Sequence, residues 1–306
     1  WNSISAIQSH DAQIVSSGIT TVFDCLRLGS DEDGGFENGE MRAIADAFET
    51  ARKEDRLRAD HRIHLRCEVS AADVMEQFED FRQDDQVGLA SLMDHAPGQR
   101  QFQTMDQYIL YYKEKRGLSD EAFEKFIRRR VEASEKYSAD HRRQIAEDCT
   151  ARGITIASHD DATLDHVEEA KAFGVRLAEF PTSLKAADAS HAAGMSVLIG
   201  APNVVRGKSH SGNIAAKSLA ERGVLDVLSS DYVPFSLIQA PFILDDEGVM
   251  SLPEAIRLVT ATPARTVGLD DRGRIAEGLK ADLVRVRRTS GVPVVRSVWR
   301  SGERVA

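Results

Sequence analysis

Acidic residues and histidines follow short apolar runs along this chain, and their types suit metal chemistry. The runs are followed by Asp24, Glu68, Asp94 with His95, His159 with Asp160 and Asp161, Glu179, Asn203 and Asp231. A single acid after a strand can simply cap the next helix. This many carboxylates around one ring would repel one another unless protons or cations lay between them. Mixed histidine and carboxylate ligation suits Zn²⁺, Mn²⁺ or Fe²⁺, so we predict a divalent metal centre.

His159 and Asp231 are the strongest candidates for ligands and catalytic groups, because each follows directly on apolar or small residues. The predicted metal ligands are His159, Asp231, Glu179, Glu68, His95 and Asp160. Most other histidines fit surface positions, namely His10, His61, His141, His166 and His191. His64 lies inside an apolar run and fits a core histidine with satisfied hydrogen bonds.

Residues 200–213 offer donors for an anion. This stretch follows an apolar run and is expected to open a helix, where backbone N–H groups and basic side chains form an anion cradle. A polar loop that binds nothing is the alternative. The predicted phosphate ligands are Asn203, Arg206, Lys208, Ser209 and His210, together with Arg66 and Arg100. A P-loop is excluded, because Pro202 stands at the motif's first glycine and lacks an N–H.

Two of these arginines come from elsewhere in the chain. The Pro97-Gly98 turn should place Arg100 above the mouth of the site. Arg66 is expected to point inward beside Glu68, where it either binds phosphate or balances the charge of that carboxylate.

Helices that end at glycine alternate with the apolar runs and must position these groups. Glycine supplies the left-handed residue that closes a helix, and the alternation predicts parallel βα units. We count seven strands, within 19–24, 63–68, 87–94, 154–161, 175–179, 195–200 and 224–231. The fold class is therefore α/β, a distorted (β/α)₈ TIM-like barrel whose eighth strand should lie upstream of Trp1. Segment 119–152 is two helices long, with no strand between.

The pattern changes after Gly268. Residues 282–287 and 294–299 alternate between apolar and polar, which indicates a small β appendage. We predict a barrel over 1–267 and a partial β-sandwich over 268–306, which must pair with a partner sheet because so few strands are not stable alone.

Composition further narrows the class of protein, its partners and its compartment. A net charge of −10 argues against nucleic acid as a partner. Three widely spaced cysteines suggest reduced thiols and a cytoplasmic protein. No stretch has the roughly 20 apolar residues of a membrane helix. A homo-oligomer is compatible with all of this.

Several motifs resemble the PhnM family of the amidohydrolase superfamily over almost the whole chain. They are residues 64–68, 91–102, 157–163, 178–182, 200–203, 209–213 and 228–232, with a closing signature at 278–284. The resemblance implies hydrolysis of α-D-ribose 1-methylphosphonate 5-triphosphate to the 5-phosphate and diphosphate, on the carbon–phosphorus lyase pathway. It implies one or two divalent ions, with Asp231 as ligand and proton acceptor and His159 as ligand.

The chain departs from this pattern in two respects. The superfamily's first-strand metal motif is absent, and Lys208 stands where the family has glycine. Two other functions stay open: a deaminase or cyclic amidase activity, and a non-catalytic subunit of a phosphonate-degrading complex. The arginines argue against the first, and the dense carboxylates argue against the second.

Overall fold

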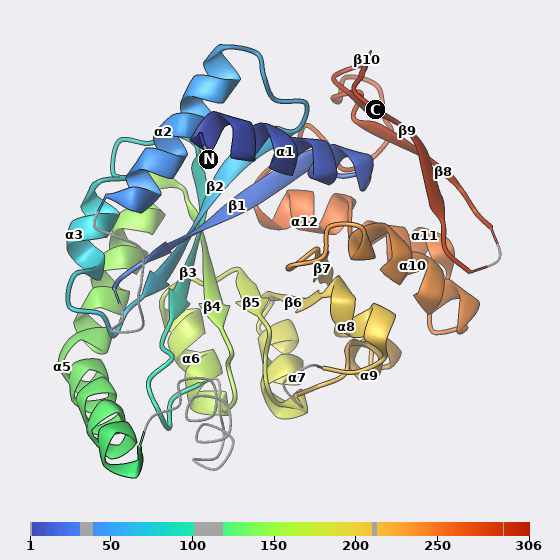
Figure 1. Ribbon diagram of the computed structural model, residues 1–306. Helices are drawn as coiled ribbons and strands as arrows, with labels where there is room; N and C mark the ends of the chain where they lie inside the picture. Colours follow the sequence, from blue (N-terminus) through green and yellow to red (C-terminus); the bar gives the residue numbers. More distant parts are fainter. Residues whose placement is uncertain (1, 31–38, 101–118, 210–212, 290) are drawn as a thin grey trace.

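Seven parallel strands form a curved sheet in the computed structural model, which describes residues 2–30, 39–100, 119–209, 213–289 and 291–306. The strands are β1 (Thr21–Leu28), β2 (Asp60–Glu68), β3 (Val87–Met93), β4 (Thr155–His159), β5 (Leu177–Glu179), β6 (Ser196–Gly200) and β7 (Val227–Ser229). They are hydrogen-bonded in chain order, with β1 and β7 at the edges. All seven predicted strands are confirmed, and the sheet is a curled half-barrel of the α/β class (Figure 1).

Helices surround the outer side of this sheet (Figure 1). They are α1 (Ser3–Ser16), α2 (Glu40–Lys53), α3 (Val74–Glu79), α5 (Asp120–Arg152), α6 (Leu164–Ala172), α7 (Leu184–Ala192), α8 (Ala201–Arg206), α9 (Ala216–Glu221), α10 (Ser236–Asp246), α11 (Leu252–Arg257) and α12 (Ala261–Thr266). The helices bury apolar stripes, as α2 does with Met41 and Ala45 in the main core beside the strands and with Phe48 against Ile7 of α1.

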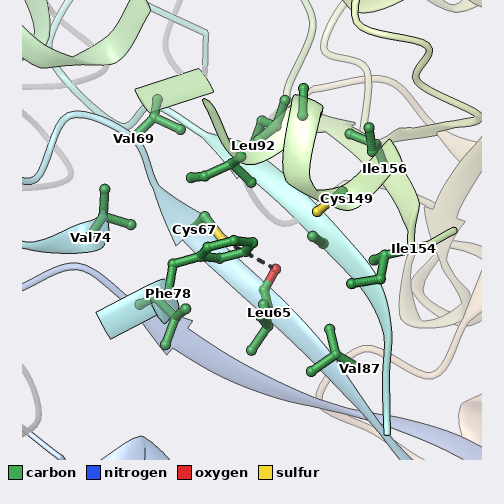
Figure 2. Close-up of a cluster of buried hydrophobic side chains, with 14 of the residues drawn as sticks. Leu65, Cys67, Val69, Val74, Phe78, Val87, Leu92, Cys149, Ile154 and Ile156 are labelled. Carbon is green, nitrogen blue, oxygen red and sulfur yellow. Dashed lines mark hydrogen bonds between the residues drawn. The ribbon is translucent and has the colours of Figure 1, made fainter. Parts of the chain in front are cut away.

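The main core lies between the outer face of the sheet and these helices. Side chains alternate across a strand, so Leu65 and Cys67 of β2 point outward. There they pack with Phe78 of α3 and Cys149 of α5 (Figure 2). The same alternation turns His64, Arg66 and Glu68 toward the inner side of the sheet, which leaves that side for polar groups.

The helical excursion is one helix instead of two. α5 is 33 residues long, and Ser119 caps its first turn by accepting the N–H of Ala122. Gly153 ends the helix in a left-handed conformation, with φ of 69°. The helix contains neither glycine nor proline, so nothing in the sequence interrupts it.

Asp24 does not end its strand. β1 continues past it to Leu28, and the Asp24 side chain contacts histidines of α1 and β2. The prediction that Asp24 lies at a strand end was wrong, because Cys25, Leu26, Arg27 and Leu28 pair with β2 as regularly as the residues before them.

The C-terminal segment forms a three-stranded antiparallel sheet in the order β10-β9-β8. Its strands are β8 (Leu283–Arg287), β9 (Val294–Arg300) and β10 (Glu303–Arg304). This sheet packs through Val284, Val295 and Val298 on Ile14 and Val15 of α1. The strands of the appendage are confirmed, while a domain boundary at 267/268 stays a prediction. Within the described ranges, no helix is long and apolar enough to cross a membrane.

Candidate active site

The inner side of the sheet is built in layers. Its lower layer is apolar and consists of Leu89, Ala157, Leu177, Leu198 and Val227, one from each of β3 to β7. Because side chains alternate, the residue two positions further along each strand also faces inward. Those positions hold Ser91, His159, Glu179, Gly200 and Ser229. A largely polar layer therefore lies at the carboxyl ends of the strands, where barrel enzymes hold their reactive groups.

His159 and Glu179 are neighbours at the ends of β4 and β5. Nδ1 of His159 lies 3.2 Å from Oε2 of Glu179, and we assign the proton to Nδ1, which donates to the carboxylate. Burial lowers the pKa of His159 to about 3. The ring is therefore neutral near pH 7, and its Nε2, which faces Arg66, is the nitrogen that can bind a metal ion.

Ser91 and His64 hold Glu179 in place from behind. The Ser91 hydroxyl donates to Oε2 of Glu179 at 2.6 Å and lies 2.5 Å from Nε2 of His64. His64 is buried, as predicted for a core histidine, and burial lowers its pKa to about 4. Neither residue is among the predicted site residues, yet together they complete a line of hydrogen bonds that ends at His159.

Glu68 and His95 form a second carboxylate–histidine pair. Oε2 of Glu68 lies 2.5 Å from Nδ1 of His95, and Oε1 accepts the His95 N–H at 2.9 Å and the Ser70 hydroxyl at 2.8 Å. Burial alone would raise the pKa of Glu68, but His95 and Arg130 outweigh it and hold that pKa well below its usual range. Glu68 is therefore an ionised carboxylate that orients His95 and leaves Nε2 of that ring available.

His95, His159 and Asp160 form one group of possible metal ligands. One nitrogen or oxygen from each lies within 4.8 Å of the others. Asp160 has a positive φ of 57°, unusual for a residue with a side chain. Its Oδ2 lies 3.6 Å from Nε2 of His159, on the side opposite Glu179. The donor set of two imidazoles and a carboxylate suits a divalent transition metal or zinc ion.

Asp231 lies over the end of β6. A side chain on Gly200 would begin only 3.0 Å from Oδ2 of Asp231, so glycine there makes room for the carboxylate. Asp231 has a φ of 48° and is exposed. Strained backbone of this kind clusters at functional sites. The structure thus places Asp231 at the same carboxyl edge as His159 and Glu179.

Arg66 points into the site, as predicted. Its Nη2 lies 3.4 Å from Nε2 of His159, whereas Glu68 contacts Arg27 at 3.5 Å and Arg130 at 4.0 Å. Other arginines therefore balance the charge of Glu68. This leaves Arg66 as a half-buried cation beside the candidate metal ligands.

Residues 201–206 form helix α8, so the stretch opens a helix as expected. Pro202 lies in the first turn, where its fixed φ favours a helix. Arg206 and Lys208 consequently lie at the end of this helix and not at its start, so the predicted cradle at a helix N-terminus was wrong for them. Arg206 Nη1 donates to the Tyr232 hydroxyl at 2.5 Å, which brings its guanidinium to the loop that carries Asp231.

The other predicted phosphate ligands of this stretch differ in position. Asn203 donates to the Ile214 carbonyl and accepts the Ala216 N–H, so its amide ties α8 to α9. Lys208 is exposed and Ser209 half-buried. His210 lies outside the described residues.

Arg100 does not stand above the mouth of the site. It is 4% exposed and ion-paired with Asp161 and Glu169. Its prediction rested on the Pro97-Gly98 turn, but Glu169 is 69 positions away in sequence and its attraction could not be seen there. Arg100 thus neutralises buried carboxylates, as Arg142 does beside Asp94 and Glu169.

Asp94, His61 and His141 lie in surroundings that differ from those predicted from the sequence. Asp94 accepts hydrogen bonds from Ser134 and Ser138 at 2.8 Å each, so it anchors α5 to β3. His61 and His141 are buried rather than at the surface. Nδ1 of His141 lies 3.0 Å from the Val69 carbonyl.

The inward alternation of β2 and β3 was the one sequence signal that could have added His64 and Ser91 to the site.

This protein combines a curled α/β sheet with histidines and carboxylates at the carboxyl edge of the strands, an arrangement typical of barrel hydrolases. The model of the amidohydrolase family matches residues 6–306, and the chain belongs to this family. Among curated proteins it is similar to the alpha-D-ribose 1-methylphosphonate 5-triphosphate diphosphatase of Escherichia coli (strain K12). The two are 46% identical over 307 residues, which cover 100% of this chain and 81% of that protein. The resemblance drawn from the motifs is thereby confirmed.

More distant similarities support the fold. The chain is 38% identical to imidazolonepropionase of Streptomyces griseus over 104 residues, 29% of this chain and 26% of that protein. Among solved structures, 5-methylcytosine deaminase from Klebsiella pneumoniae matches with a TM-score of 0.61 at 14% identity, over 99% of this chain and 75% of that one. N-acetylglucosamine-6-phosphate deacetylase from Pasteurella multocida matches with a TM-score of 0.61 at 13% identity, over 99% and 80%. At these identities the structures establish the fold alone.

Proposed function

We propose that this protein hydrolyses α-D-ribose 1-methylphosphonate 5-triphosphate to the 5-phosphate and diphosphate, in phosphonate catabolism. The observation that carries the proposal is the 46% identity over the whole chain to the E. coli diphosphatase. Arg66 and Arg206, placed beside His159 and Tyr232, support it because a triphosphate needs cations at the mouth of a protein with net charge −10.

The residues of the inner layer fit one or two divalent ions, Zn²⁺, Mn²⁺ or Fe²⁺. His95, His159 and Asp160 would hold metal, with Asp231 as a further ligand. Glu179 and Glu68 fit a supporting role better than direct ligation, because each carboxylate already accepts a hydrogen bond from the histidine it orients. When bound, a divalent ion polarises a phosphoryl oxygen and acidifies water.

The chain's own groups supply the rest of the reaction. Asp231 accepts the proton of the attacking water, since it is an exposed carboxylate at the edge of the site. Arg66 holds a phosphoryl oxygen beside His159. Arg206, kept in place by Tyr232, binds the terminal phosphates, and its planar group can contact two oxygens at once.

Arginine and lysine variants at the end of α8 test this assignment. We expect Arg206→Ala to lower kcat/KM for the triphosphate about ten- to a hundredfold, mainly through KM, the scale of one lost charge-assisted contact of about 1.5–3 kcal/mol. Lys208→Ala should have a smaller effect, because lysine acts only as a point charge. Steady-state assays of diphosphate release measure both.

A ribose 5-phosphate monoester is the matched control substrate. Its binding should depend much less on either residue, because it lacks the terminal phosphates. If both variants hydrolyse the triphosphate with unchanged kcat/KM, the end of α8 does not bind phosphate. Turnover of a cyclic amide or aminopyrimidine in preference to the triphosphate would favour the deaminase or amidase alternative.

A further inference from the structure

A second group of possible metal ligands lies on the outer side of the sheet, where α1 runs beside β1 and β2 (Figure 1). It consists of His10 in α1, Asp24 in β1 and His61 in β2, with one ligand atom of each within 4.8 Å of the others. His10 Nε2 lies 2.9 Å from Oδ1 of Asp24, and His61 Nδ1 lies 2.7 Å from Oδ2. Two histidines therefore converge on one carboxylate.

This group is separate from the candidate active site. Asp24 alternates with Phe23 and Cys25, and Phe23 packs against the apolar layer of the inner side. Cys25 Sγ lies 3.3 Å from Nδ1 of His64, which also faces inward. Asp24 must then face outward. The sheet itself lies between the two groups.

Asp11 orients the ring of His61 from behind. Its Oδ1 lies 3.3 Å from Nε2 of His61 and accepts the N–H groups of Arg58 and Ala59 at 2.9 Å each. Because Nε2 of His61 is hydrogen-bonded to Asp11, Nδ1 of the same ring points toward Asp24. A carboxylate behind a histidine is the arrangement that fixes histidine ligands in zinc sites.

Burial and charge also fit a cation. The side chains of Asp11 and His61 are each 2% exposed and that of Asp24 10%, whereas His10 is 40% exposed. Asp11, Asp24 and His61 are thus shielded from solvent by the protein, and an ion from solution would enter beside His10. Two carboxylates, Asp11 and Asp24, flank His61, so this position favours a positive charge, which the protonated ring supplies without metal and a zinc ion would supply in its place. Two nitrogens, one carboxylate and a water make a four-coordinate set that zinc accepts.

We propose that His10, Asp24 and His61 bind a zinc ion, with Asp11 as the hydrogen-bond partner that orients His61. Binding replaces the hydrogen bonds between the two rings and Asp24. The Nδ1 proton of His61 is released to water while its Nε2–H stays hydrogen-bonded to Asp11, and the ring proton of His10 moves from Nε2 to Nδ1. The ion joins α1 to the first two strands. Its role is structural, and the proposal does not rest on the diphosphatase activity.

Zinc content of three proteins tests the site. We expect the wild type, equilibrated with Zn²⁺ and freed of excess metal, to hold one more zinc per chain than His10→Ala. His191→Ala is the matched control, because His191 is also 40% exposed and pairs with a carboxylate, Asp226, on the outer surface. It should keep the wild-type content. Equal zinc in all three proteins, measured by mass spectrometry with inductively coupled plasma, would overturn the proposal.

Asp11→Asn provides a second variant that keeps the oxygen on the backbone N–H groups of Arg58 and Ala59. We expect it to weaken zinc binding at this site about 10- to 100-fold, the usual effect of losing such a partner. Competition with a coloured chelator measures the affinity, and substituting Co²⁺ reports the ligand geometry by its absorption. Diphosphate release by His10→Ala in added metal should stay near wild type, which separates this site from the catalytic one. An Asp11→Asn affinity equal to that of the wild type would contradict the role of Asp11.

Discussion

Asp231→Asn should reduce diphosphate release by on the order of 10³-fold or more while the protein stays folded. The amide is nearly the same size as the carboxylate, and Gly200 leaves room for either. An amide can neither accept the proton of water nor bind a divalent ion as an anion. Turnover under saturating substrate, with circular dichroism as the check on folding, measures the effect.

Asp188→Asn is the control for this change. It makes the same substitution on the outer surface, where Asp188 pairs with Arg222. Its turnover should equal that of the wild type. Near-normal turnover of Asp231→Asn would mean that Asp231 only shapes the loop after β7 and takes no part in the reaction.

Arg100→Ala should destabilise the protein by about 3–5 kcal/mol, the usual cost of leaving a buried partner charge unpaired. Arg100 is buried between Asp161 and Glu169, and Asp161 is 1% exposed. Burial raises the pKa of Asp161 against the opposing influence of Arg100. Removing the guanidinium leaves that carboxyl group buried without its cation. Chemical unfolding gives the change in the free energy of unfolding.

Arg222→Ala is the matched control, because its guanidinium pairs with Asp188 at the surface. Exposed pairs of this kind contribute little to the free energy of unfolding, because water and salt screen them. If Arg100→Ala unfolds no more easily than Arg222→Ala but raises KM for the triphosphate, Arg100 is a phosphate ligand after all.

The strands could be predicted because their signals are local. Most are short apolar runs, and a left-handed glycine closes the helix before five of them, namely Gly18, Gly153, Gly174, Gly194 and Gly223. The positions of His159 and Glu179 follow from the same signals, since both end a strand. Local patterns thus predict the layer that carries the candidate site.

The partners of charged side chains could not be predicted in this way. Arg100 meets Glu169 across 69 positions, and Asp94 meets Ser134 and Ser138 across 40 and 44. Such pairs form only when distant helices pack on the sheet. The sequence therefore suggested a ring of carboxylates that a divalent metal centre holds together, whereas arginines and serines satisfy several of them.

Product analysis of the metal-loaded and metal-free protein tests the central proposal most directly. Phosphorus NMR of α-D-ribose 1-methylphosphonate 5-triphosphate with the loaded protein should show the 5-phosphate and diphosphate appearing in equal amounts. Chelation should stop the reaction, and Zn²⁺, Mn²⁺ or Fe²⁺ should restore it. An unchanged triphosphate with the loaded protein, or cleavage that continues unaffected after complete removal of metal, would contradict the account.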